Sequence, residues 1–171
     1  MKDSDLIMVV DDVPQNVELL EAHLRPLGYD IITASSGEEA LIKLSVYDVD
    51  LILLDVMMAG LDGFEVTRRI RSDPAHFQLP IILVTALRGT EDRIMGIEAG
   101  CDDFLSKPYD KVELFARVRS LLKVKAYTDL LANYTKELEA EVLKRTDYMK
   151  NDLESLKTAL KNTSLPTRPI F

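Results

Sequence analysis

The chain has 171 residues, enough for one hydrophobic core and an additional segment, and its formal net charge is −8. Residues 1–124 carry 13 Lys and Arg against 22 Asp and Glu, which excludes the basic surface typical of nucleic-acid-binding proteins. One cysteine excludes an internal disulfide and no apolar segment approaches the ~20 residues that cross a bilayer, so we expect a cytoplasmic protein that binds neither nucleic acid nor membrane.

Five short apolar runs are predicted to form β-strands, at residues 6–10, 30–34, 51–54, 80–84 and 103–106. Between and after these runs, apolar residues recur at helical spacing, starting at Val17, Ala40, Phe64, Ile94 and Val112. Strands that alternate with helices form parallel sheets through right-handed crossovers. The sequence therefore predicts a doubly wound α/β domain with helices on both faces of the sheet, ending near residue 124.

Three positions carry signals for the start of a helix. Pro14 suits a first helical turn, where its missing N–H would have no partner anyway. Ser35 and Ser36 precede two acidic residues, and Thr90 precedes Glu91 and Asp92. Both arrangements predict a hydroxyl N-cap followed by acidic residues in the first turn.

Polar residues follow four of the predicted strands directly. Two carboxylates come after the first strand, one after the third, a hydroxyl after the fourth and an amine after the fifth: Asp11, Asp12, Asp55, Thr85 and Lys107. In parallel sheets, functional groups collect at the carboxyl ends of the strands. Three carboxylates at one edge repel one another unless a divalent cation, a proton or a cationic side chain neutralises them. We therefore expect the chemistry of the protein at this edge.

This series of motifs, with Pro108 after the lysine, resembles the receiver domain of two-component response regulators over residues 5–124. The resemblance implies a flavodoxin-like fold with five parallel strands in the order 2-1-3-4-5. It also implies that Asp55 is the phosphoacceptor. A sensor histidine kinase or a phosphotransfer protein would donate the phosphoryl group. Beyond this self-phosphotransfer and a slow autodephosphorylation, we expect no enzymatic activity.

The resemblance also implies a Mg²⁺ site. Asp12 and Asp55 would bind the ion, Asp11 would assist directly or through water, and the backbone carbonyl of Met57 would complete the protein ligands. These are the oxygen ligands that Mg²⁺ prefers. A carboxylate nucleophile gives an acyl phosphate, and phosphoryl transfer depends mainly on charge neutralisation and in-line positioning.

Thr85, Lys107 and Phe104 receive further roles from the resemblance. Thr85 and Lys107 would contact the phosphoryl oxygens, and Lys107 supplies a point charge. Thr85 and Phe104 would form a switch, in which the hydroxyl swings toward the phosphoryl group and the ring enters the vacated space. The Lys107–Pro108 peptide bond would be cis.

Two other classes of protein place phosphate chemistry on similar sheets. A haloacid-dehalogenase-type phosphohydrolase needs a second aspartate two positions after its nucleophile, where this chain has Met57. A flavodoxin-like cofactor binder places hydroxyl or glycine residues after the first strand to hold phosphate. Here residues 11–16 present negative charge instead. Both readings are disfavoured.

The segment after the predicted receiver contains no glycine or proline from residue 123 to 160. Its seam, on one helical face, repeats every 11 residues: Tyr127, Leu131, Tyr134, Leu138, Val142, Arg145, Met149, Leu153, Leu156 and Leu160. An 11-residue period gives a nearly straight or slightly right-handed coiled coil. Because a lone helix with this apolar stripe would be poorly soluble, we expect a parallel homodimer in which Arg145 disfavours a single locked packing.

Residues 126–149 resemble the linker helices that precede HD-GYP phosphodiesterase or diguanylate cyclase domains. We therefore expect a receiver at 1–124, a coiled-coil linker at 125–162 and an irregular tail at 163–171. We expect the effector to be absent from this sequence and to act in cyclic-di-GMP turnover. The alternative is a stand-alone regulator whose coiled coil is itself the output.

Overall fold

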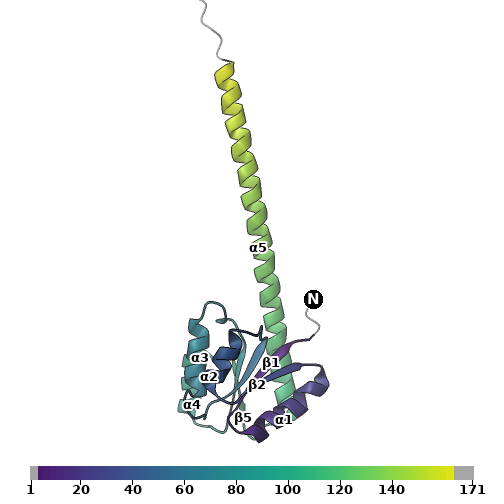
Figure 1. Cartoon of the computed structure of the whole chain (residues 1–171), viewed down its shortest axis with the longest axis vertical. Coiled ribbons are helices and arrows are strands. Elements are labelled where there is room, and N and C mark those ends of the chain that lie inside the picture. Colours follow the sequence, from purple (N-terminus) through teal and green to yellow (C-terminus); the bar gives the residue numbers. More distant parts are fainter. Residues whose placement is uncertain (1–3, 164–171) are drawn as a thin grey trace, which may run out of the picture. The chain divides into compact units, whose positions relative to one another are not determined.

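The computed structural model describes residues 4–163. Its sheet has five parallel strands in the order β2-β1-β3-β4-β5. Figure 1 shows the sheet with helices packed around it. The strands are β1 (Leu6–Val10), β2 (Asp30–Ala34), β3 (Leu51–Asp55), β4 (Ile81–Thr85) and β5 (Asp103–Ser106). The order and the parallel pairing confirm the predicted flavodoxin-like topology.

Six helical elements connect and follow the strands: α1 (Pro14–Leu24), η1 (Arg25–Leu27), α2 (Gly37–Leu44), α3 (Gly63–Ser72), α4 (Thr90–Ala99) and α5 (Lys111–Asn162). Helices α2, α3 and α4 cover one face of the sheet. There Phe64, Ile70 and Ala99 pack in one cluster with every second residue of a strand, such as Met8 and Val10 of β1. Helices α1 and α5 cover the other face. The sheet is therefore doubly wound, as the alternation of elements predicts.

The helix starts agree with two of the three sequence signals. Pro14 begins α1, and the Ser36 Oγ accepts a hydrogen bond from the Glu39 N–H (3.1 Å) at the start of α2. The hydroxyl N-cap predicted at Thr90 is wrong, because Thr90 is the first residue of α4 and Gly89 is the N-cap, whereas Glu91 and Asp92 do lie in the first turn. There the Gly89 N–H donates to the Asp92 carboxylate (3.2 Å), so an acidic side chain does the capping.

The apolar spacing that starts at Val17 continues at Leu20, Leu24 and Leu27, and the structure divides this stretch in two. Helix α1 ends at Leu24, and Arg25–Leu27 form a 3₁₀ turn that Gly28 closes with φ +89°. Pro26 explains the change, because a proline lacks the N–H that an α-helix interior requires. Gly28 permits the positive φ without a steric penalty.

Internal contacts divide the chain into two units, residues 1–127 and residues 128–171. In the first unit, α5 buries Leu114, Val118 and Leu122. In the second unit, residues 128–162 are helical and their large apolar side chains are exposed, including Leu138 (52%) and Leu153 (53%). The division expected from the sequence at residues 124 and 162 stays a prediction, and residues 164–171 of the expected tail lie outside the described part. None of the helices among residues 4–163 could cross a membrane.

Candidate functional site

Three carboxylates meet at the carboxyl edge of the sheet. Strands β1 and β3 are neighbours, with Val10 opposite Leu54, so the residues that follow these two positions lie side by side. One carboxylate oxygen from each of Asp11, Asp12 and Asp55 lies within 4.8 Å of the others. Asp11 and Asp55 are buried and Asp12 is exposed. The set is open to solvent on one side and offers only oxygen ligands, which fits a hard divalent cation.

Lys107 brings a positive charge to the cluster from the end of β5. Its Nζ donates to Asp11 Oδ2 at 2.7 Å and to Asp55 Oδ1 at 3.2 Å. The Lys107–Pro108 peptide bond is cis, as the resemblance implies. The amine therefore neutralises part of the charge of the two buried carboxylates and holds them in a fixed arrangement.

The electrostatic surroundings of Asp55 shift the pKa of its carboxyl upward. Burial raises the pKa of the Asp55 carboxyl above its usual range, Lys107 opposes this shift, and the charges of Asp11 and Asp12 add to it. A carboxylate whose pKa is raised is a stronger base and a better nucleophile than an exposed aspartate.

Asn16 is part of the site and was not singled out in the sequence. Its side-chain amide donates to both oxygens of Asp11, at 3.2 and 3.0 Å. The Val13 N–H donates to Asp11 Oδ1 at 2.9 Å. These bonds fix the orientation of Asp11. The signal in the sequence was a polar residue in the first turn of the helix that follows the aspartate pair.

Thr85 lies at the end of β4 and is 4% exposed. Its Oγ1 accepts a hydrogen bond from the Leu87 N–H (3.1 Å), so the hydroxyl is engaged by the loop that follows the strand. On β5, the Phe104 ring packs against Gly96 of α4, and the Arg93 guanidinium lies 6.0 Å from the ring centroid. The two predicted switch residues therefore occupy neighbouring strands, each in contact with a different part of the β4–α4 region.

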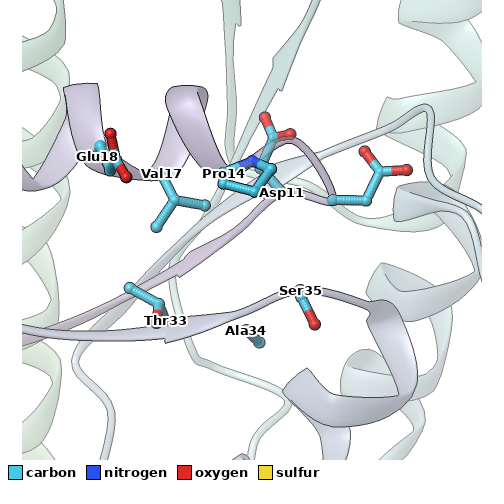
Figure 2. Close-up of a pocket in the computed structure, with 8 residues that line it drawn as sticks. Asp11, Pro14, Val17, Glu18, Thr33, Ala34 and Ser35 are labelled. Carbon is cyan, nitrogen blue, oxygen red and sulfur yellow. The ribbon is translucent and has the colours of Figure 1, made fainter.

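Three of the hollows in the described structure lie at this end of the sheet. The first, of about 250 Å³, lies between α1 and the end of β2, and Figure 2 shows Val17 and Glu18 on one side and Thr33 and Ser35 on the other. The second, of about 280 Å³, includes Leu19, His23, Lys107 and Tyr109 among its lining residues. The third, of about 500 Å³, includes Met57, which is 63% exposed.

Comparisons with known proteins agree with this geometry. Residues 7–119 match the model of the response regulator receiver domain. The chain is 51% identical over 125 residues to the response regulator PleD of Caulobacter vibrioides, an alignment that covers 73% of this chain and 28% of PleD. The chain thus spans less than two thirds of the length of such curated relatives.

Solved structures show the same fold. A response regulator from Chloroflexus aurantiacus is 38% identical to this chain and superposes with a TM-score of 0.68. The match covers 70% of this chain and 98% of that structure. The receiver domain of a sensor histidine kinase from Pseudomonas aeruginosa, solved with a magnesium ion in its active-site cleft, shares 33% identity with a TM-score of 0.66 and the same coverage. With its strand order, its edge of carboxylates and these matches, the chain belongs to the response regulator receiver domain family.

Proposed function

We propose that Asp55 accepts a phosphoryl group from a sensor histidine kinase or a phosphotransfer protein. The observation that carries this proposal is the position of Asp55, which lies in a cluster with Asp11 and Asp12 while its Oδ1 accepts a hydrogen bond from Lys107. In the transfer, an Asp55 oxygen bonds to phosphorus while the donor's P–N bond breaks and its electron pair returns to the histidine. The product is an acyl phosphate.

Asp12, Asp55 and the Met57 carbonyl would hold Mg²⁺. The oxygens of Asp11 already accept hydrogen bonds from Val13, Asn16 and Lys107, so we infer that Asp11 assists through water. When bound, the ion neutralises charge on the phosphoryl oxygens. Lys107 would supply the remaining positive charge by moving its Nζ from the carboxylates to a phosphoryl oxygen.

Thr85 and Phe104 would convert this local event into a change of surface. The Thr85 hydroxyl would leave the Leu87 N–H and donate to a phosphoryl oxygen, which moves the loop that leads into α4. Phe104 packs directly on α4 at Gly96, so a shift of α4 and a shift of the ring would accompany each other.

The phosphodonor would dock beside Lys107. The hollow lined by Leu19, Pro108 and Tyr109 also reaches Lys107, whose amine contacts Asp55. Leu19 is 48% exposed on α1 and gives this surface an apolar contact point. A partner that fills the hollow would bring its phosphohistidine to the edge of the sheet that carries Asp55.

A second copy of the chain would pair with the helix of residues 128–162. This helix exposes its apolar seam, and residues 128–163 carry six Lys or Arg against seven Asp or Glu, so two such helices do not repel each other by net charge. A symmetric pair would pass the signal to an effector of cyclic-di-GMP turnover, which the resemblance of residues 126–149 supports. The alternative is a stand-alone regulator, in which the paired helices themselves bind the next protein of the signalling pathway.

The test is phosphorylation of the full chain with acetyl phosphate and Mg²⁺. We expect one acid-stable, base-labile phosphate per chain, its absence in Asp55→Asn, and its presence in the matched control Asp73→Asn, which changes an aspartate that pairs with His76. Labelling of Asp55→Asn at the level of the parent protein would reject Asp55 as the acceptor. Labelling that persists in the presence of excess EDTA would reject the metal site.

A further inference from the structure

Methionine side chains gather in a groove that the residues directly after β3 help to line. Met57, Met58 and Met95 all line the groove of about 500 Å³. Met57 and Met95 are 63% and 44% exposed, whereas Met58 is 9% exposed. Two of the three methionine side chains are therefore accessible to solvent.

Other sulfurs in the described chain are protected or lie elsewhere. Met8 is fully buried in the core. Cys101 is half-buried, and burial raises the pKa of its thiol to about 11, so the reactive thiolate is scarce at neutral pH. Met149 is exposed but lies in the second unit, on the seam that a second copy would cover. An oxidant would therefore react at the methionines of the groove rather than at the cysteine.

Met57 is the exposed methionine nearest to the chemistry in sequence. It follows Asp55 by two residues, and it shares the groove with Leu87, whose N–H bonds to Thr85. A thioether and an aliphatic side chain do not hold water, because the sulfur is a weak acceptor and the carbon atoms accept no hydrogen bonds. Neither side chain would therefore orient a water molecule that approaches an Asp55 acyl phosphate from this groove.

We propose that Met57 is a modification site for peroxide-class oxidants and that its oxidation shortens the lifetime of the phosphoryl group on Asp55. The inference rests on the proposed function. The sulfur takes one oxygen from hydrogen peroxide and is oxidised by two electrons, the O–O bond breaks, and water leaves. The product is a sulfoxide, a polar group that methionine sulfoxide reductases convert back to the thioether.

The sulfoxide oxygen accepts hydrogen bonds, so it holds and orients a water molecule at the wall of the groove. Water held there attacks the acyl phosphate more often, in the same way that a polar side chain at position 57 would promote attack. The receiver thereby combines two inputs: a phosphodonor loads Asp55, and an oxidant at Met57 accelerates the loss of the signal.

The experiment uses the full chain before and after treatment with hydrogen peroxide. Peptide mass spectrometry measures the oxidation of each methionine, and acetyl phosphate labelling followed by a chase measures the phosphoryl lifetime. We expect Met57 to oxidise faster than Met8 and Met58, and the lifetime to fall about tenfold. Treatment with methionine sulfoxide reductases, one for each of the two sulfoxide epimers, should restore the original lifetime.

Two variants identify the responsible sulfur. The ratio of lifetimes before and after peroxide should be one in Met57→Leu, which has no sulfur there, and should stay near tenfold in the matched control Met95→Leu. Oxidation of Met57 without a change in lifetime, or an equal acceleration in Met57→Leu, would overturn the inference alone. Absence of label in the untreated chain would overturn the proposed function, and this inference with it.

Discussion

Gly96 in α4 lies directly against the ring of Phe104 in β5. A Cβ built at Gly96 would stand 2.3 Å from Phe104 Cζ and 3.0 Å from Leu83 Cδ1, so no larger residue fits while the ring keeps this place. We expect Gly96→Ala to lower the free energy of unfolding by about 1–3 kcal/mol through overpacking. In a Phe104→Ala background, the same change should instead stabilise the chain by about 1 kcal/mol, because alanine favours a helix over glycine.

A double-mutant cycle by denaturant unfolding measures this change of sign. If Gly96→Ala changes the free energy of unfolding equally in the two backgrounds, the Phe104 ring does not cause the effect of the added methyl group. Acetyl phosphate labelling of the same four proteins then tests the proposed switch. If the ring and α4 move together, displacement of the ring by the added methyl group of Gly96→Ala also changes the rate at which Asp55 is labelled.

Asp55 should destabilise the fold at neutral pH in the absence of a divalent cation. Its pKa is raised in the folded state, chiefly by burial, so its charged form is disfavoured by folding. Asp55→Asn should therefore unfold at a higher temperature than the parent protein at pH 7. The difference should shrink as the pH falls through the folded-state pKa of Asp55 toward its ordinary value, because protonation removes the penalty. Thermal unfolding in EDTA at several pH values provides the measurement, and a constant difference across the range would contradict it.

Removal of Lys107 should make the fold depend on metal. Lys107→Met leaves Asp11 and Asp55 without the amine that now neutralises them, at a cost of about 1–3 kcal/mol. Mg²⁺ neutralises the same carboxylates, so saturating Mg²⁺ should recover most of this loss. Denaturant unfolding with Mg²⁺ and with EDTA tests the prediction, and Lys123→Met, which changes an exposed lysine, is the matched control. Equal losses of Lys107→Met with and without Mg²⁺ would contradict the metal site.

The phosphoryl group should be long-lived in the reduced protein. The resemblance to receivers implies that residues 57 and 87 would flank the path of the attacking water, where Met57 and Leu87 would neither orient nor deprotonate it. The double variant Met57→Asn with Leu87→Glu should shorten the lifetime about tenfold, which corresponds to about 1.4 kcal/mol of barrier. A chase after acetyl phosphate labelling provides the measurement. A double variant that loses phosphate no faster would show that residues 57 and 87 do not control the rate of hydrolysis.

The sequence predicted the residues at the carboxyl edge of the sheet better than the helix residues that contact them. Asp11, Asp55 and Lys107 were predictable because apolar runs define the strands, and parallel strands bring their carboxyl ends together. The amide of Asn16 bonds to Asp11, but many polar residues in a first turn have no such partner, so the sequence alone did not distinguish it. The contact of Gly96 with Phe104 depends on how closely α4 approaches β5, which periodicity does not specify.

Helix starts show the same limit. Ser36 was predictable as a cap because its hydroxyl acts locally, on the N–H of a residue three positions later. At α4, Thr90 offered an equally good hydroxyl, yet the N-cap is Gly89, one residue before Thr90. The Asp92 carboxylate accepts the hydrogen bond of the Gly89 N–H there. Two competing local caps one residue apart give the same sequence signal.

The helix of residues 128–162 should pair in parallel with a second copy, and phosphorylation should change the pairing. Leu138 and Leu153 lie on the apolar seam and are about half exposed, at 52% and 53%, which is the state that a second copy would bury. Arg145 lies between them on the same seam and pairs with Glu141 of its own helix (2.9 Å). A charge at this point would weaken the centre of the paired seam, so we expect two packings of similar free energy.

Cysteine crosslinking tests both parts of this prediction. In a Cys101→Ser background, Leu138→Cys and Leu153→Cys should each form a disulfide between chains. Ala140→Cys, which follows Leu138 by two residues and so lies on the opposite side of the helix, should not. Beryllofluoride, which mimics the phosphoryl group, should change the yield at Leu138→Cys relative to Leu153→Cys. Equal yields with and without beryllofluoride would remove the switch, and sedimentation as a monomer at micromolar concentration in both states would remove the dimer, because a helix with this seam buries it only against a partner.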